Sequence, residues 1–223
     1  MKQWKIMFVL LFIVISSCSD DNPTNNNNNN NVSFDTVKIG TQVWMKKNLD
    51  VDHYRNGDPI PNVTDQLKWT KLTTGAWCCY ENEVYWNDIY GKLYNWFAVN
   101  DSRGLAPKGW HIPSYDEWKV LIDYLGGKYE ASSKLKDTGT IYWKYPFEDA
   151  TNESGFSALS GGLRYDDGNF SYLEYQGIWW STTEYLGSKP YPAWGWMLVA
   201  DTIGIYDIHP HKSHGLSIRC VKD

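Results

Sequence analysis

The clearest pattern of apolar and polar positions lies near the middle of the chain and has the period of an α-helix. Ser114 and Glu117 have the S-x-x-E spacing of a capping box, in which each side chain bonds to the backbone of the other residue. Gly126 and Gly127 follow, as expected where a helix ends. Between these signals apolar residues recur at i, i+3, i+4 and i+7, namely Trp118, Leu121, Ile122 and Leu125. The pattern predicts an amphipathic helix with one buried face.

A second helical pattern precedes the first one along the chain. Leu93, Trp96 and Phe97 fall at helical spacing, and a loop that contains proline and glycine separates the two patterns. A further helical turn is expected over residues 132–136. The sequence therefore predicts two amphipathic helices whose apolar faces need a partner surface.

The other apolar segments are short and alternate as β-strands do. Residues 36–45 alternate around Gly40 and Thr41 and predict a hairpin, and residues 76–82 predict a short strand that runs into a loop. Further strands are predicted in the second half of the chain, at residues 177–184, 193–199, 203–208 and 216–221. Strands on both sides of helices predict an α+β fold with an antiparallel sheet.

The N-terminal residues have the organisation of a secretory signal peptide. A cationic start precedes ten apolar residues, Ile6 to Ile15, a run that is too short to span a bilayer. The small residues that follow end in Cys18 and resemble a bacterial lipobox, which implies cleavage before Cys18 and lipidation of its thiol. An ordinary signal peptide cut nearby is the alternative. We expect residues 1–17 to be a lipoprotein signal peptide, with Cys18 as the lipid attachment site.

A polar tether is expected after the signal peptide. Ser19-Asp20-Asp21 resembles the export signal of Bacteroidetes surface lipoproteins, although a plain solvated linker would look similar. Residues 22–31 are almost all Asn, with no apolar residue to bury. We therefore expect a disordered tether over residues 18–32 and one folded domain over residues 33–223. The expected location is the outer membrane, exposed at the surface of a Bacteroidetes-type bacterium.

The net charge and the apolar runs of the chain limit the kinds of partner that it is expected to bind. The formal net charge is −5 and no basic stripe is visible, which disfavours binding to nucleic acid. No second long apolar run follows the signal peptide, so the expected membrane contact is the lipid anchor alone. The aromatic content is high, 16%, and most of these rings are expected in the core, since Trp and Tyr are large core and contact residues.

Three cysteines follow Cys18. Because an exported protein meets an oxidising environment, one disulfide is expected, between Cys220 and either Cys78 or Cys79. A catalytic thiol is the alternative, and it is disfavoured because no His lies near these cysteines in the sequence.

Six motifs occur in order, at residues 38–45, 90–96, 107–113, 152–159, 179–184 and 215–221. Together they resemble the Fibrobacter succinogenes major paralogous domain family, and the resemblance covers about residues 36–223. It implies a fold similar to those of C-type lectins and of the formylglycine-generating enzyme, with two helices flanking a small antiparallel sheet, paired terminal strands at the base and a loop-rich half. Some members carry Cys where this chain has Ala106, which points the expected disulfide to Cys78 or Cys79.

Two groups of residues are candidates for metal binding. His209, His211 and His214 could supply three zinc ligands, but a solvated loop is the better interpretation. Asp166, Asp167 and Asn169 could form a calcium cluster but first indicate a turn, and the lectin Glu-Pro-Asn and Gln-Pro-Asp triplets are absent. No metal or other cofactor is therefore expected.

Candidates for catalysis are equally weak. No G-x-S-x-G elbow occurs, and paired carboxylates such as Glu174 and Glu184 depend on a separation that the sequence does not fix. Formylglycine-type oxidation needs a cysteine pair in the C-terminal half, where only Cys220 lies. The chain is therefore not expected to be an enzyme.

Binding is the function that these exclusions favour. Trp194 and Trp196 lie two apart and share one strand face, which is either core or an open platform. Tyr191 lies in the preceding proline-containing loop, and Trp86 with Asp88 forms a second candidate patch. We expect a surface-anchored lipoprotein with a C-type-lectin-like domain that binds a polysaccharide or another cell-surface molecule. The alternatives are a glycan-active enzyme and a structural or protein-interaction component of the cell envelope.

Overall fold

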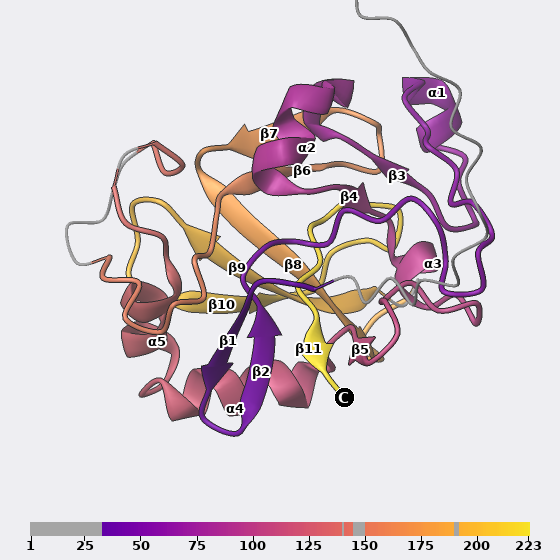
Figure 1. Cartoon of the computed structure of the whole chain (residues 1–223). Coiled ribbons are helices and arrows are strands. Elements are labelled where there is room, and N and C mark those ends of the chain that lie inside the picture. The colour runs from indigo at the N-terminus through magenta and orange to yellow at the C-terminus, as the bar shows by residue number, and fades with distance from the viewer. Residues whose placement is uncertain (1–32, 140, 145–149, 190–191) are drawn as a thin grey trace, which may run out of the picture. The chain divides into compact units, whose positions relative to one another are not determined.

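The longest strand, β8 (Gln176–Glu184), organises the central sheet. It pairs antiparallel with β9 (Ala193–Val199), which pairs antiparallel with β10 (Ile205–Ile208), so the sheet order is β10-β9-β8 (Figure 1). The register places Ile178 opposite Met197 and Met197 opposite Tyr206. The computed structural model describes residues 33–223 except residue 140, residues 145–149 and residues 190–191. Residues Phe34–Asp223 form one compact unit.

A second sheet joins strands from both ends of this unit. The hairpin of β1 (Thr36–Ile39) and β2 (Gln42–Met45) confirms the prediction, and Gly40 has the positive φ, 60°, that its turn requires. β11 (Val221–Lys222) pairs with β2 and with β5 (Trp110–His111), which gives the order β1-β2-β11-β5. The strand predicted over residues 216–221 is mostly irregular and contributes isolated bridges, such as the one between Leu216 and Tyr94.

Two smaller ribbons complete the strands. β3 (Trp77–Cys78) pairs with β4 (Leu93–Tyr94), and β6 (Gly161–Arg164) pairs with β7 (Phe170–Leu173). All pairings between named strands are antiparallel.

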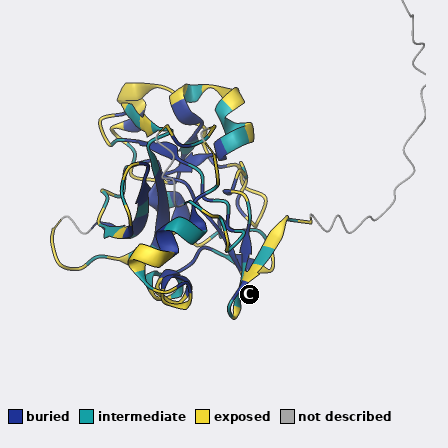
Figure 2. Ribbon diagram, turned by 90° about the vertical axis from the view of Figure 1, so that its left-hand side faces the viewer, coloured by how far each residue is buried: buried dark blue, intermediate teal, exposed yellow. Residues whose placement is uncertain are grey.

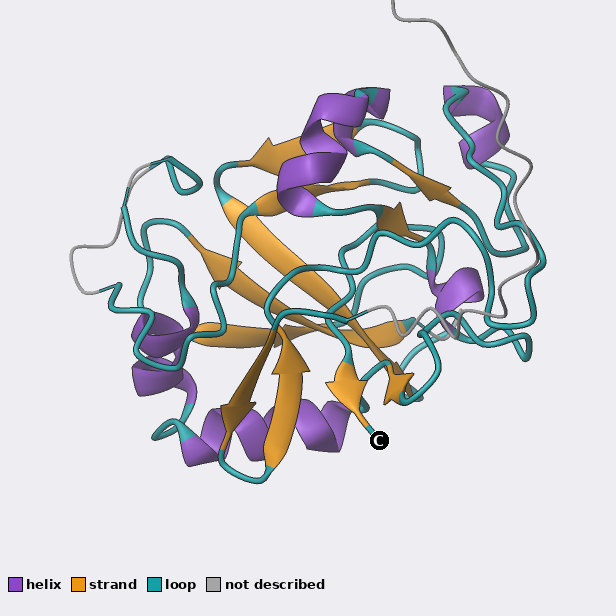
Figure 3. Ribbon diagram, viewed as in Figure 1, coloured by secondary structure: helices purple, strands orange, loops and turns teal. Residues whose placement is uncertain are grey.

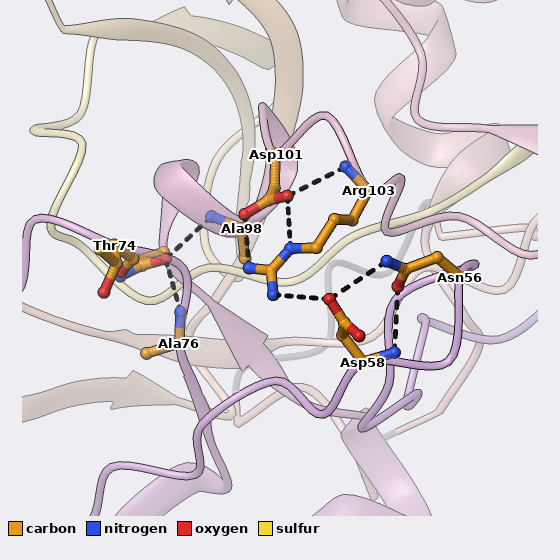
Figure 4. Close-up of polar contacts among 8 residues, drawn as sticks. Asn56, Asp58, Thr74, Ala76, Ala98, Asp101 and Arg103 are labelled. Carbon is orange, nitrogen blue, oxygen red and sulfur yellow. Dashed lines mark hydrogen bonds and ion pairs between the residues drawn. The ribbon is translucent and has the colours of Figure 1, made fainter.

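The helix predicted from Leu93 onward is partly wrong. Leu93 pairs with Cys78 in the ribbon, and only α3 (Trp96–Val99) is helical. The change occurs at Asn95, whose side-chain Oδ1 accepts hydrogen bonds from the backbone N–H groups of Ala76 and Ala98, both labelled in Figure 4. As the N-cap residue, Asn95 keeps extended backbone angles, and its side chain bonds to the first turn of α3, so the chain becomes helical only from Trp96.

The predicted central helix is α4 (Tyr115–Tyr124), and it begins with the expected capping box of Ser114 and Glu117. α5 (Lys128–Leu135) extends the helical turn predicted near its end. Three short elements precede these helices: α1 (Gln66–Trp69), the 3-10 helix η1 (Tyr80–Asn82) and α2 (Val84–Tyr90). Figure 3 shows that short strands and long loops make up most of the structure, with few helices.

The core is largely aromatic. α4 and α5 cover one face of the central sheet through a buried cluster that includes Trp118, Trp179 and Trp196. Figure 2 shows the central strands buried and the short helices carrying much of the exposed surface. The prediction of an α+β chain with small antiparallel sheets is confirmed. Within the described residues, every helix is too short or too polar to cross a membrane.

Candidate ligand-binding site

The two faces of the central sheet differ because side chains alternate along each strand. Trp179, Trp196 and Leu198 point to the face that α4 and α5 cover, and they are buried. Ile178 and Met197 lie opposite each other on the second face. α3 packs on this second face near Ser181, whose carbonyl accepts a hydrogen bond from Trp96, and a cleft opens on the part near Ile178 and Met197.

The cleft has a volume of about 230 Å³ and an apolar floor. β8, β9 and β10 supply the floor, β6 and the residue after it supply one wall, and the segment after β10 supplies the other. Its lining residues are Leu163, Tyr165, Gln176, Ile178, Met197, Ile208, His209, Pro210, His214 and Leu216. A concave, mostly apolar site with a few polar groups is the usual form of a small-ligand site.

His214 is the most constrained polar group of the cleft. Its Nε2 lies 3.4 Å from the Asp166 carboxylate, and the Tyr165 ring lies edge-on at 5.3 Å. Burial lowers the pKa of His214 below its usual value, although Asp166 opposes the shift. The lowered pKa favours the neutral imidazole at pH 7, and the nearest charged group at this point is the Asp166 carboxylate.

A group of four rings, which we call the aromatic cluster, lies at the end of the same sheet. Trp194 contacts Tyr115 with ring centroids 4.4 Å apart, Tyr185 at 5.0 Å and His209 at 4.2 Å. Tyr185 also stacks on His209 at 3.7 Å. All four rings are partly or fully exposed, and His209 belongs both to the aromatic cluster and to the cleft wall.

Ion pairs flank the aromatic cluster on two elements. Lys128 of α5 pairs with Asp207 of β10, and Lys212 pairs with Glu184 at the end of β8. Burial opposes the charge of Asp207, but the contact with Lys128 lowers its pKa overall. The cluster is thus bordered by charged hydrogen-bonding groups that already neutralise each other.

The sequence-predicted binding residues have different outcomes. Trp194 is partly exposed in the aromatic cluster, but Trp196 is only 1% exposed and cannot contact a ligand, because Tyr115 stacks over it. Trp86 is half-buried on α2, and Asp88 is exposed beside a second pocket of about 320 Å³. Tyr191 lies outside the described residues, as do the signal peptide, Cys18 and residues 18–32.

The predicted metal candidates do not converge. His209 stacks on Tyr185, whereas His214 pairs with Asp166, and the rings of His211 and His214 lie 6.2 Å apart. Throughout the described ranges, no three His, Cys, Asp or Glu side chains gather as a metal site would require. The calcium candidates form a turn, in which Asp167 accepts hydrogen bonds from the backbone and side chain of Asn169.

The predicted disulfide is wrong, because Cys78, Cys79 and Cys220 are all buried free thiols. Cys78 belongs to a cluster with Trp69 and Leu93, whereas Cys220 packs in a different cluster with Met45 and other residues of the terminal strands. Burial raises the pKa of the Cys78 and Cys220 thiols to about 12, so neither is a reactive thiolate.

Glu174 and Glu184, the candidate pair of catalytic carboxylates, lie far apart. Glu174 precedes β8, and Glu184 ends it, so the whole strand lies between them. At about 3.3 Å per residue this places them roughly 30 Å apart, far beyond the spacing of a glycosidase pair. The two cannot act on one glycosidic bond.

A charged network near α3 is the most conspicuous alternative site (Figure 4). Arg103 binds both carboxylate oxygens of Asp101 and one oxygen of Asp58, and Asn56 binds Asp58 as well. The hydrogen bond that Arg103 donates to Asp101 lowers the pKa of the Asp101 carboxyl to about 2. The hydrogen bonds of the network join the loop that holds Asn56 and Asp58 to the loop before β5, so we assign it a structural role.

Sequence reasoning missed most residues of the cleft and two rings of the aromatic cluster. Tyr115 is the first residue of α4, and in the sequence it indicates only the start of a helix. Tyr185 indicates only a loop. The available signal was the alternation of β8, in which Gln176 and Ile178 share one face and Trp179 lies on the other. That signal becomes informative only once the partner strands are known.

Comparison with known proteins gives one match. The family model for the Fibrobacter succinogenes major domain matches residues 37–222, nearly all of the compact unit. None of the curated proteins and none of the solved structures matches the chain.

Proposed function

We propose that this chain, which belongs to the Fibrobacter succinogenes major domain family, is a surface-anchored lipoprotein whose folded domain binds polysaccharide. The anchor is the lipidated Cys18 and the spacer is the Asn-rich tether. The domain acts as a binding module with a C-type-lectin-like arrangement. That arrangement is supported by β11, which lies beside β2 and so pairs the terminal strands of the unit, and by the long loops.

The aromatic cluster is the single observation that carries the proposal. Trp194, Tyr115 and Tyr185 present partly exposed rings that are already packed on each other, so a ligand need not order them. Aromatic faces fit the apolar faces of sugar rings, and Tyr and Trp also keep a polar group for hydrogen bonding. The neighbouring pair of Lys212 and Glu184 offers hydrogen-bonding groups for sugar hydroxyls.

A glycan array tests the proposal. The purified protein is screened with and without calcium, and hits are titrated against Trp194→Ala. We expect reproducible binding that Trp194→Ala reduces at least tenfold while its circular dichroism spectrum stays native. Tyr129→Ala, which removes an exposed ring on α5 at 71% exposure, is the matched control and should leave binding unchanged. Loss of binding in Trp86→Ala instead would move the site to α2, and binding of no glycan would refute the proposal.

A further inference from the structure

We infer that the cleft on the second face of the central sheet receives an uncharged acyl substituent of the glycan, so that the protein selects acylated sugars. This inference rests on the proposed function and specifies its ligand class. The aromatic cluster would hold one sugar ring of the chain, and the cleft would hold the acyl group that a neighbouring sugar carries.

The floor of the cleft is unsuited to a bare sugar. Ile178, Met197 and Ile208 form an aliphatic surface, and Leu163 and Leu216 close it from the sides. A sugar hydroxyl placed on this surface would lose its hydrogen bonds to water and gain none, which is unfavourable. The methyl group of an acetyl substituent gains from the same burial. The floor therefore discriminates in favour of an apolar substituent.

The charge of the cleft selects against ionic groups. Among the described residues that line it, none is Lys, Arg, Asp or Glu. His214 is neutral at pH 7, because burial lowers its pKa, and its Nε2 already faces Asp166. A carboxylate, sulfate or ammonium group would find no partner of opposite charge on these walls. Gln176 adds an amide that can both donate and accept, which matches the carbonyl and N–H of an acetamido group.

His209 makes the cleft and the aromatic cluster neighbours. Its ring stacks on Tyr185 and lies 4.2 Å from Trp194, and the same residue and Pro210 line the cleft. Trp194 shares the strand face of Trp196, so the cluster and the cleft lie on opposite faces of the sheet and meet at His209, just after β10. A glycan chain bound at the cluster therefore reaches the cleft past His209, and a substituent on a neighbouring sugar of that chain is the part that enters it.

Matched pairs of polymers isolate the acyl group. The detergent-solubilised full-length chain is titrated by calorimetry with chitohexaose against cellohexaose, and with acetylated xylan and glucomannan against the same polymers after deacetylation. One apolar carbon in a pocket discriminates about 10–200-fold, so we expect the acylated member of at least one pair to bind at least tenfold more tightly.

Three variants separate the inference from the proposed function. Met197→Gln keeps the side-chain length on the partly exposed cleft floor and should abolish the preference, so that both members of a pair bind with similar affinity. Val120→Gln, on the exposed side of α4, is the control and should keep the preference. Trp194→Ala should weaken both members of a pair.

Each outcome decides between the two claims. Glycan binding without preference, or a preference that survives in Met197→Gln, overturns the inference and leaves the proposed function standing. Binding of no polymer in any pair, with no effect of Trp194→Ala on any array hit, overturns both.

Discussion

The imidazole of His111 lies between two carboxylates, with its Nε2 2.7 Å from Glu117 Oε1 and its Nδ1 2.8 Å from Asp223 Oδ1. Glu117 also closes the capping box of α4 through Ser114. His111 is in β5, which pairs with β11. One side chain therefore connects the start of the central helix to the strand that pairs the two ends of the folded unit.

This contact predicts a pH window for stability. Burial opposes the charge of His111, but hydrogen bonds to Glu117 and Asp223 raise its pKa above 6.5, so its contribution is complete below that value and is lost as pH rises through the folded-state pKa. Burial also opposes the charge of Glu117, but bonds from Ser114 and His111 lower its pKa below 4.5, so its contribution is complete above 4.5 and is lost on acidification. The pair is fully formed between about pH 4.5 and 6.5.

Urea unfolding of His111→Gln measures this contribution. Both side chains are about one-third exposed, so we expect a loss of about 0.5–1 kcal/mol at pH 5.5 that shrinks as the pH approaches 9. His53→Gln is the control, because His53 lies 2.7 Å from Asp52 but is more exposed and joins no two elements. A loss in His111→Gln that is equal at pH 5.5 and pH 9 would contradict the ion-pair interpretation.

Arg219 is predicted to contribute strongly to stability. It is 1% exposed, and its guanidinium donates to the carbonyl groups of Met45, Lys46 and Phe156 and to the Asn48 side chain. Arg219→Met would remove this donor from the buried carbonyl groups, and we expect a loss of about 3–5 kcal/mol in the free energy of unfolding.

Arg103, whose guanidinium is partly exposed, is the control residue for Arg219. The Arg103 side chain is 37% exposed in its network with Asp101 and Asp58, so Arg103→Met should lower the free energy of unfolding much less than Arg219→Met. Arg219→Lys keeps the charge but has no planar fork, and it should recover only part of the loss. Equal urea midpoints for Arg219→Met and Arg103→Met would show that the buried contacts contribute little.

The parts of the fold that the sequence predicted are those with local causes. α4 was predictable because Ser114, Glu117 and the apolar face all lie within a few residues of each other, and the β1–β2 hairpin was predictable from its turn. Leu93 was misassigned because its pairing with Cys78 joins distant residues. The cleft could not be predicted, since its lining comes from β6, β8, β9, β10 and the segment after β10, and only the tertiary structure brings these together.

The three buried free thiols should be protected from alkylation in the native protein. Cys78 and Cys220 are 0% exposed and Cys79 is 6% exposed. We expect alkylation by iodoacetamide to label none of the three in the native protein within minutes and all three in urea, as read by mass spectrometry without any reductant. Detection of a peptide that links Cys220 to Cys78 or Cys79 would contradict the structure.

Substitutions of the two neighbouring tryptophans, Trp194 and Trp196, should differ in their effects on stability and on glycan binding. Trp196 is buried beneath Tyr115, so Trp196→Ala should lower the free energy of unfolding by about 3–5 kcal/mol. Trp194 is only partly buried, so Trp194→Ala should cost roughly 1–2 kcal/mol and leave a folded protein whose defect is in glycan binding. Thermal unfolding together with the glycan titration checks both, and a larger stability loss in Trp194→Ala would place that ring in the core instead.

Glycan binding should weaken on acidification because of His214. Burial holds its pKa below 6.5, and His211 acts in the same direction, while Asp166 and Asp167 oppose the shift and Tyr165 lies edge-on to the ring. The neutral ring therefore favours the folded state above about pH 6.5, and this contribution is lost as the pH falls through the lowered folded-state pKa. The same protonation places a positive charge on the wall of an otherwise uncharged cleft. We expect affinity to be constant from pH 8 to 6.5 and to fall below that range in the wild-type protein.

Two variants test this assignment. His214→Gln, whose amide does not titrate, should bind with an affinity that does not change with pH. His111→Gln should keep the wild-type profile, because it alters stability far from the cleft lining. An acid loss that persists in His214→Gln would exclude His214 as its cause.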